Sequence, residues 1–485
     1  MDEYNKHAAL ADTIKIEDIT SCTRKQSILQ RLKDNDESFD KLWICYRDQI
    51  EDHRDYSPDS DKELAWLGYF LGQNTNIKEL YIPSDLGLFN DSGRDVFRKG
   101  LGNNKSIQEM VLRGFDLHAG QMLRMLDQFL KNNNNLSEIK IEDCPAGAEG
   151  VRQLSLAIGD CNQSLKQFSL QDNDMEDGQL VDIITALSMH PQLTELCLVN
   201  NGTNMGRNEC TALSTLLRCT TTQLKALNLD NNDIDDEGVE VLASALVNLN
   251  QLQELNLDSN SSITIKGWRA VASLLELSSS SLKSLDVSFN DIGNEEVMVF
   301  VNALANNSTL KELDMQHCDI TEEGWSPFSR LLCDNSSVNN TYLSNHTIEH
   351  IRGTTDAHVN KYLVLNKRED KQQVAMTKIL QNHSYFDMQS FFEWEFKVLP
   401  LMIDWFVNAA RRVTTYDQKI SRLRLSATFD FIKEFPMLYI EPVTRQEIAE
   451  YTAMEEQLLQ GGKVGSAPGQ LEDIRQRKAR AMRRL

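Results

Sequence analysis

The sequence contains no run of 18 apolar residues, so it offers no candidate for a membrane-spanning helix. Its first residues lack the basic start and apolar stretch of a secretory leader, which favours the cytoplasm, with the nucleus as the alternative. The nine cysteines are an odd number, are scattered and form no Cys-x-x-Cys pair. They predict reduced structural thiols, not a disulfide framework or a zinc site.

Basic residues are also scarce. The chain has 50 Lys and Arg against 72 Asp and Glu, a formal net charge of −22. Such a charge repels nucleic acid and anionic membranes, so we expect neither a nucleic-acid partner nor membrane insertion. The alternative is that the charge serves solubility alone.

Catalytic motifs are missing as well. There is no phosphate-binding GxxxxGK[ST] loop, no GxSxG, no HExxH and no kinase signature. His346 and His350 have the spacing of a helical metal pair, but no third ligand accompanies them. Cys318 follows His317 but stands at a structural position of the repeat described below. The sequence therefore predicts no catalytic residue, no metal, no cofactor and no enzyme activity.

What the sequence does contain is a repeat, LxxLxLxxN. Clear copies begin at Leu165, Leu193, Leu224, Leu252 and Leu282, and weaker ones at Ile77, Ile107, Leu136, Leu310 and Val338. The segment FDKLWI from Phe39 opens the array. We predict a solenoid over 39–350 with about 11 repeats of about 29 residues.

Each repeat changes its apolar period half-way. In LKALNLDNN, Leu227 and Leu229 lie two apart, as on a strand. In the following DIDDEGVEVLASALVNLN, the residues Ile234, Val241, Leu242, Ala245 and Leu246 fall on one helical face. One unit cannot bury its own apolar faces, so the copies must stack. The prediction is an α/β fold, a right-handed leucine-rich-repeat horseshoe with a concave parallel sheet and convex helices.

The ninth position of the clear copies is asparagine, at Asn173, Asn201, Asn232, Asn260 and Asn290. Its amide can satisfy backbone groups where the chain leaves the strand, so we assign this column a structural role. Asparagine-bearing repeats of this length with a helix in each resemble the ribonuclease-inhibitor-like class of leucine-rich-repeat proteins, over about residues 20–350. The segments FDKLWI and FFEWEFKVLPLMIDWF also resemble uncharacterised leucine-rich-repeat proteins of single-celled algae, a resemblance that implies no activity.

The two ends have other compositions. Residues 1–38 predict an N-terminal segment and helical cap, with Ile28, Leu29 and Leu32 at helical spacing. Residues 351–440 predict an α-helical region whose apolar segment 391–412 either caps the array or docks elsewhere. Residues 441–485 predict a charged helical or disordered tail with a basic end, which is either solvated or an import or acidic-partner signal.

The third, fifth and seventh positions of the copies point away from the helices and form the concave face. They carry eleven acidic residues and only two basic ones, Arg113 and Lys140. Lysines at the second position, such as Lys225, are the counter-argument, because they would neutralise part of this charge from the rim. Tyr81, Tyr342 and Phe289 are candidate aromatic anchors. The candidate partner-binding residues are Glu195, Asn228, Asp230, Glu254, Asn256, Asp258, Asp286, Phe289, Glu312 and Asp314.

The leading functional hypothesis is a scaffold that binds a basic protein partner on this acidic face. One alternative is a regulator of a small GTPase, resembling the activating proteins of the Ran GTPase in fold only. A second alternative is an intracellular ligand sensor. The sequence leaves the identity of the partner and the oligomeric state open.

Overall fold

The computed structural model describes residues 2–45, 55–83, 89–114, 117, 121–161, 163–202, 204–219, 223–383, 448–454 and 474–478. The chain divides into two units, one of Met1–Asp334 with Ser344–Glu369 and one of Asn335–Leu343 with Asp370–Leu485. The predicted apolar segment 391–412 and most of the predicted tail 441–485, including much of its basic end, lie outside the described residues.

The first unit is built on a single parallel sheet, in which 12 strands are seen among the described residues. Strands β3 to β12 follow one another in sequence order, and β1 and then β2 complete the sheet beside β3. The strands are β1 (Lys41–Ile44), β2 (Asp55–Tyr56), β3 (Glu79–Pro83), β4 (Glu109–Arg113), β5 (Glu138–Glu142), β6 (Gln167–Gln171), β7 (Glu195–Val199), β8 (Ala226–Asn228), β9 (Glu254–Asn256), β10 (Ser284–Asp286), β11 (Glu312–Asp314) and β12 (His350–Arg352).

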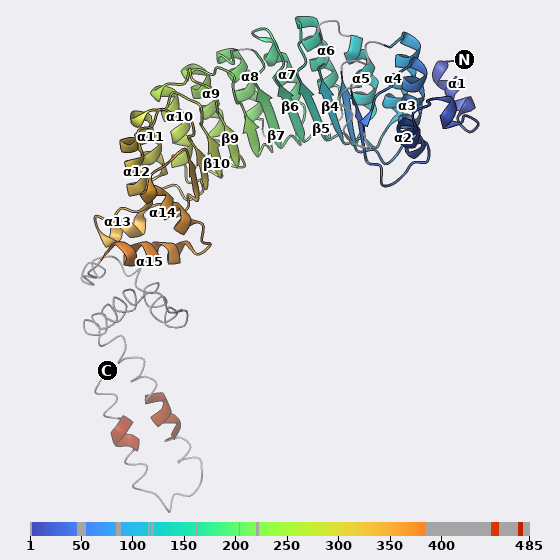
Figure 1. Ribbon diagram of the computed structural model, residues 1–485. Coiled ribbons are helices and arrows are strands. Elements are labelled where there is room, and N and C mark those ends of the chain that lie inside the picture. The colour runs from blue at the N-terminus through green and yellow to red at the C-terminus, as the bar shows by residue number, and fades with distance from the viewer. Residues whose placement is uncertain are drawn as a thin grey trace, which may run out of the picture. The chain divides into compact units, whose positions relative to one another are not determined.

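A helix precedes or follows nearly every strand. In Figure 1 the strands of this unit line the inner side of an arc and the helices its outer side, as the repeat pattern predicts. The helices are α1 (Glu3–Leu10), α2 (Thr23–Lys33), α3 (Asp61–Gln73), α4 (Asp91–Asn103), α5 (Gln121–Asn132), α6 (Ala148–Gly159), α7 (Gln179–Leu187), α8 (Arg207–Leu217), α9 (Asp236–Leu246), α10 (Ile265–Glu276), α11 (Asn294–Leu304), α12 (Glu322–Leu332) and α14 (Ala357–Asn366).

The second unit contains α13 (Val338–Leu343) and α15 (Lys371–Asn382), together with short helical stretches at 448–454 and 474–478. Within it, the hydroxyl of Thr341 on α13 lies 2.8 Å from Nε2 of His383, which follows α15. α15 buries Val374, Met376 and Ile379.

One repeat illustrates how the sequence produces strand and helix. Leu224, Leu227 and Leu229 are at most 1% exposed, because they point from the strand into the core. Asp235 caps α9 by accepting a bond of 2.8 Å from the backbone N–H of Gly238. Within α9 the buried face uses Val239 beside the expected Leu242, while the predicted Val241 is only half-buried.

The asparagine ladder at the ninth position is confirmed as structural. Asn260 is fully buried, and its Nδ2 donates to the carbonyls of Leu229, Leu257 and Asp258 at 2.9 to 3.1 Å. Its Oδ1 accepts from the backbone N–H groups of Asn232 and Ile234. The amide thus ties its own turn to the preceding repeat, at a point where the strand hydrogen bonds have ended.

A second buried ladder, which the sequence analysis did not anticipate, lies three residues before the first position of several repeats. Asn104 donates to the carbonyls of Leu71 and Asn74 at 2.7 and 2.9 Å, and its Oδ1 accepts from the backbone of Ser106 and Ile107. The same position is filled by Asn74, Asn133, His190, Asn307 and Asn345. These side chains fix the turn from helix to strand, as the first ladder fixes the turn from strand to helix.

The predicted repeat copy at Val338 is wrong. Residues Val338–Leu343 form α13, and the strand that follows β11 is instead β12, which pairs with β11 through Ile351 and Leu313. The apolar residues of this repeat are Ile348 and Ile351, with Asn345 in the second ladder. The sheet therefore continues just past residue 350, and the helix α13 occurs as an insertion between α12 and β12.

In the N-terminal segment, the helix α2 buries Ile28, Leu29 and Leu32. The structure adds β2, whose Asp55 and Tyr56 pair with Trp43 and Ile44 of β1. This strand extends the sheet beyond β1 and was not predicted, because two residues carry no periodicity.

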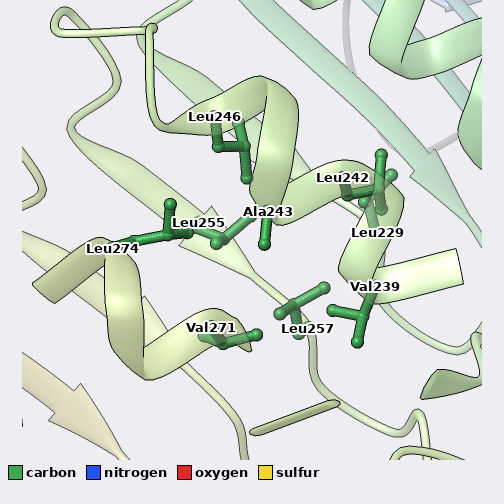
Figure 2. Close-up of a pocket in the computed structure, with 9 residues that line it drawn as sticks. All are labelled: Leu229, Val239, Leu242, Ala243, Leu246, Leu255, Leu257, Val271 and Leu274. Atoms are coloured by element: carbon green, nitrogen blue, oxygen red, sulfur yellow. The ribbon is translucent and has the colours of Figure 1, made fainter. Parts of the chain in front are cut away.

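The core between repeats is closely packed. Figure 2 shows the side chains around one interior cavity between α9, α10 and the strands beneath them, with Ala243, Leu257 and Val271 pointing toward one another. The cavity volume is about 10 Å³ and its lining is entirely apolar, so it barely has room for one water and offers that water no partner. It is far too small to bind a ligand. No helix in the described part of the chain is long and apolar enough to cross a membrane.

Candidate functional site

The parallel register arranges the predicted partner-binding residues in rows across the sheet. Glu195, Ala226, Glu254, Ser284 and Glu312 stand opposite one another at the third position. At the fifth position the row runs Cys197, Asn228, Asn256, Asp286 and Asp314. Glu195, Glu254 and Glu312 are exposed, so the third row presents its carboxylates to solvent.

The side chains of the fifth row also stabilise the turns that follow the strands, a role that was not predicted from the sequence. The side-chain oxygens of Asn228, Asn256, Asp286 and Asp314 each accept a bond from the backbone N–H two residues later, at 2.8 to 3.0 Å. This Asx turn replaces the strand ladder where the strand ends. These four residues therefore shape the edge of the concave face. The amide nitrogens of Asn228 and Asn256 and the second oxygen of Asp286 are what remains for a partner, because the second oxygen of Asp314 contacts Arg352.

The carboxylates of Asp230 and Asp258, at the seventh position, accept no bond from a described backbone N–H group, although that of Asp258 accepts one of 2.9 Å from the Ser259 hydroxyl. Asp230 is half-buried, and burial together with the nearby carboxylates of Asp258 and Asp286 raises its pKa to about 6. Burial, followed by the charge of Asp286, also raises the pKa of Asp258. Like charges are held close together here at a cost to the fold, which is the electrostatic pattern expected of a surface that receives a cation.

The pKa of Asp230 predicts the sign of a stability change. The pKa in the folded state lies above the ordinary value of 3.8. Protonation of Asp230 therefore contributes its full stabilisation below pH 3.8, and this contribution is lost as the pH rises through about 6. Asp230→Asn should therefore raise the free energy of unfolding at pH 7.5 by about 1 kcal/mol, after screening by solvent. The gain should disappear near pH 4. Urea unfolding at both pH values measures it, and a loss of stability at pH 7.5 would contradict the account.

The charge is not uniform along the face. Towards the N-terminal end the acids are paired, since Lys41 contacts Glu79, while Lys140 lies 2.8 Å from Glu109 and 2.6 Å from Glu138. At the other end Arg352 of β12 lies 3.1 Å from Asp314. Between them, within the described residues, no basic side chain pairs with Glu195, Asp230, Glu254, Asp258, Asp286 or Glu312. We call these six residues the acidic patch.

The lysines of the second position do not neutralise the acidic patch by direct pairing. Lys283 donates to Gln253 at 2.8 Å, and Lys311 lies 3.3 Å from Glu349. Both partners lie outside the patch. Lys225 makes no ion pair with a described residue.

The three candidate aromatic anchors have different positions. Tyr81 lies on β3 with its ring centroid 6.1 Å from that of Trp43, in the part of the face where the acids are paired. The assignment of Tyr342 to a strand was wrong, because it lies in α13. Phe289 is 52% exposed and stacks on His317, with centroids 4.2 Å apart and planes at 25°. His317 was not predicted as its companion, although both residues occupy the eighth position of adjacent repeats.

His346, His350 and Cys318 form no reactive cluster with other described residues. His350 lies on β12 and His346 in the preceding loop, so they are not a helical pair. Among the described residues, no three of His, Cys, Asp and Glu are grouped to hold a metal ion. The Cys318 sulfur lies 3.5 Å from the carbonyl oxygen of Val287, and burial raises its pKa to about 11. The thiol therefore stays protonated at neutral pH and is a poor nucleophile.

Known proteins share this repeat. A family model described as Leucine Rich repeat matches residues 222–243, 278–300 and 306–329. Ribonuclease inhibitor from Mus musculus is 30% identical over 211 residues, which is 43% of this chain and 45% of that protein. Ribonuclease inhibitor from Sus scrofa is 26% identical over the same shares. The leucine-rich repeats of this chain are therefore similar to those of the ribonuclease inhibitors.

Proteins named for NACHT, LRR and PYD domains are also similar to this chain. NACHT, LRR and PYD domains-containing protein 12 from Mus musculus is 28% identical over 42% of this chain and 19% of that protein. The match thus spans less than half the length of each of these relatives. A solved structure of a TLR13–ssRNA13 complex covers 53% of this chain and 35% of its own at 15% identity, with a TM-score of 0.34, too low to support an argument.

Proposed function

We propose that this chain is a protein-binding scaffold, without catalytic activity of its own, that holds a basic segment of a partner on its acidic patch. The observation that carries the proposal is the acidic patch over β7 to β11, whose carboxylates pair with no basic side chain in the part of the chain that the structure describes, and in which Asp230 and Asp258 have raised pKa values. A cation arriving there relieves repulsion that the folded chain already bears. Binding should therefore be salt-sensitive and steered at long range.

Two further features support a scaffold. The ladders of buried amides hold the strands in fixed register, so binding need not order the surface first. The ribonuclease inhibitors among the relatives are, by name, inhibitors of an enzyme, which is consistent with action through contact. An array of this kind offers an extended concave surface suited to a protein and not to a small molecule.

The test is charge reversal at two residues. Asp230→Lys with Asp258→Lys should weaken capture of a basic partner at least tenfold, because two attractions become repulsions. Asp286 and Asp314 are left intact, since they accept backbone bonds and their reversal would disturb the turn. The immobilised chain is exposed to native extract, captured proteins are identified, and the affinity of the purified partner is measured at two salt concentrations.

The matched control is Glu276→Lys with Glu323→Lys, which changes the net charge equally at exposed positions of α10 and α12. The control should retain capture. Undiminished binding by the Asp230 and Asp258 variant, or an equal loss in the control, would refute recognition by the acidic patch.

A further inference from the structure

The eighth position of the repeats forms a column of left-handed backbone. Its φ angles lie between 47° and 70° in eight successive repeats, at Gly114, Asp143, Asp172, Asn200, Asn231, Ser259, Phe289 and His317. Glycine, asparagine and aspartate tolerate this region because they lack bulk at Cβ or bond locally to the backbone. Six of these eight repeats follow that preference or place a serine there.

Phe289 is the exception that needs a reason. A bulky residue is strained at a φ of 51°, and asparagine would fit better. Burial of the Phe289 side chain does not offset this backbone strain, because the side chain is 52% exposed. Strain that packing does not repay is a mark of a functional position. The ring is held in place by stacking on His317, which has the same backbone conformation.

The carboxylates near the Phe289 ring favour one kind of partner side chain. The backbone N–H and the hydroxyl of Ser288, the residue before Phe289, both donate to the carboxylate of Asp286. Asp314 stands three residues before His317 and beside Asp286 across the sheet. An aromatic face next to carboxylates suits a planar cation that stacks and bonds in the same plane. Arginine has that shape, whereas the lysine ammonium is a compact point charge.

We propose that Phe289 and His317 form a stacking platform for an arginine side chain of the basic partner, whose guanidinium reaches the carboxylates of the acidic patch. The inference rests on the proposed function and adds a preference for arginine over lysine. The aromatic pair supplies the selectivity, and the carboxylates supply the attraction common to both cations.

The test compares two synthetic peptides of equal length and charge, one with six arginines and one with six lysines, spaced by glycine and serine. The full chain should bind the arginine peptide roughly threefold to tenfold more tightly at low salt. Phe289→Asn should remove that preference by weakening the arginine peptide alone. Its melting temperature should stay the same or rise, because asparagine relieves the left-handed strain. The control is Met298→Gln on α11 of the same repeat, another exposed apolar side chain, which should change neither affinity.

The outcomes separate the two proposals. Equal binding of both peptides by the unmodified chain, or a preference that survives Phe289→Asn, overturns the platform and leaves the acidic patch standing. A fall of several degrees in the melting temperature of Phe289→Asn also overturns it, because the ring would then be structural. If neither peptide binds, or if Asp230→Lys with Asp258→Lys leaves both affinities unchanged, the acidic patch itself is refuted, and the platform with it.

Discussion

Replacing Asn260 by alanine is expected to lower the free energy of unfolding by about 4 kcal/mol. The side chain donates to three buried carbonyls and accepts from two backbone N–H groups of the preceding repeat. Alanine leaves three of these groups, the Leu229 carbonyl and the N–H groups of Asn232 and Ile234, without their partner, in a place that water reaches only if the turn opens. The carbonyls of Leu257 and Asp258 keep bonds from Asn290 and Asn231. Each unsatisfied backbone group costs about 1 to 3 kcal/mol, and relaxation of the turn recovers part of the sum.

Urea denaturation followed by circular dichroism measures this loss. The chain supplies its own graded control, because Cys144 and Cys318 occupy the same repeat position, and their sulfurs lie 3.1 Å from the Glu142 carbonyl and 3.5 Å from that of Val287. Asn260→Cys should therefore lose less than Asn260→Ala. Asn248→Ala, at an exposed position after α9, should be nearly neutral. A loss below about 1 kcal/mol for Asn260→Ala would contradict the role of the ladder.

Trp268→Ala should cost about 4 kcal/mol as well, for a different reason. The indole is fully buried in α10 and packs against Phe300 with ring centroids 5.9 Å apart. Truncation leaves a cavity between α10 and α11 that rigid neighbouring repeats cannot fill. The same denaturation experiment measures the change.

Trp268→Phe separates packing from hydrogen bonding. The indole Nε1 has no acceptor among the described residues, so its N–H is buried at a cost and phenylalanine removes that cost. We expect Trp268→Phe to lose no more than about 1.5 kcal/mol, the usual limit for a swap that largely conserves volume. Equal losses in the two variants would mean that the indole N–H has a partner and that the packing argument fails.

Much of the fold could be predicted because each repeat contains both the apolar spacing of a strand and the apolar spacing of a helix. The two-residue spacing of Leu227 and Leu229 and the helical spacing that follows are local properties, and their recurrence fixes a stacked parallel sheet. The error at Val338 has the same origin. The apolar spacing from Val338 matches the repeat in part, although the residues from Val338 form α13 and the strand follows Ile348.

The candidate site was predictable only in part. Register placed the acidic residues on one face, since side chains alternate along a strand. Which acids remain unpaired depended on contacts between strands, such as Lys140 with Glu109, and these are set by side-chain conformation. The stacking of Phe289 on His317 depended on a left-handed backbone in two repeats, which their side chains do not signal.

The sequence by itself thus determined the repeat, the parallel sheet, the first amide ladder and the acidic character of the concave face, because all four follow from spacing along one chain. Only the tertiary structure decided where the array ends, that the fifth-position residues close Asx turns, and that Gly100 lies so close to Gly68 that no side chain fits between α3 and α4. These features arise from atoms roughly 30 residues apart meeting across neighbouring repeats. Their positions depend on how the repeats stack, which spacing within one repeat does not encode.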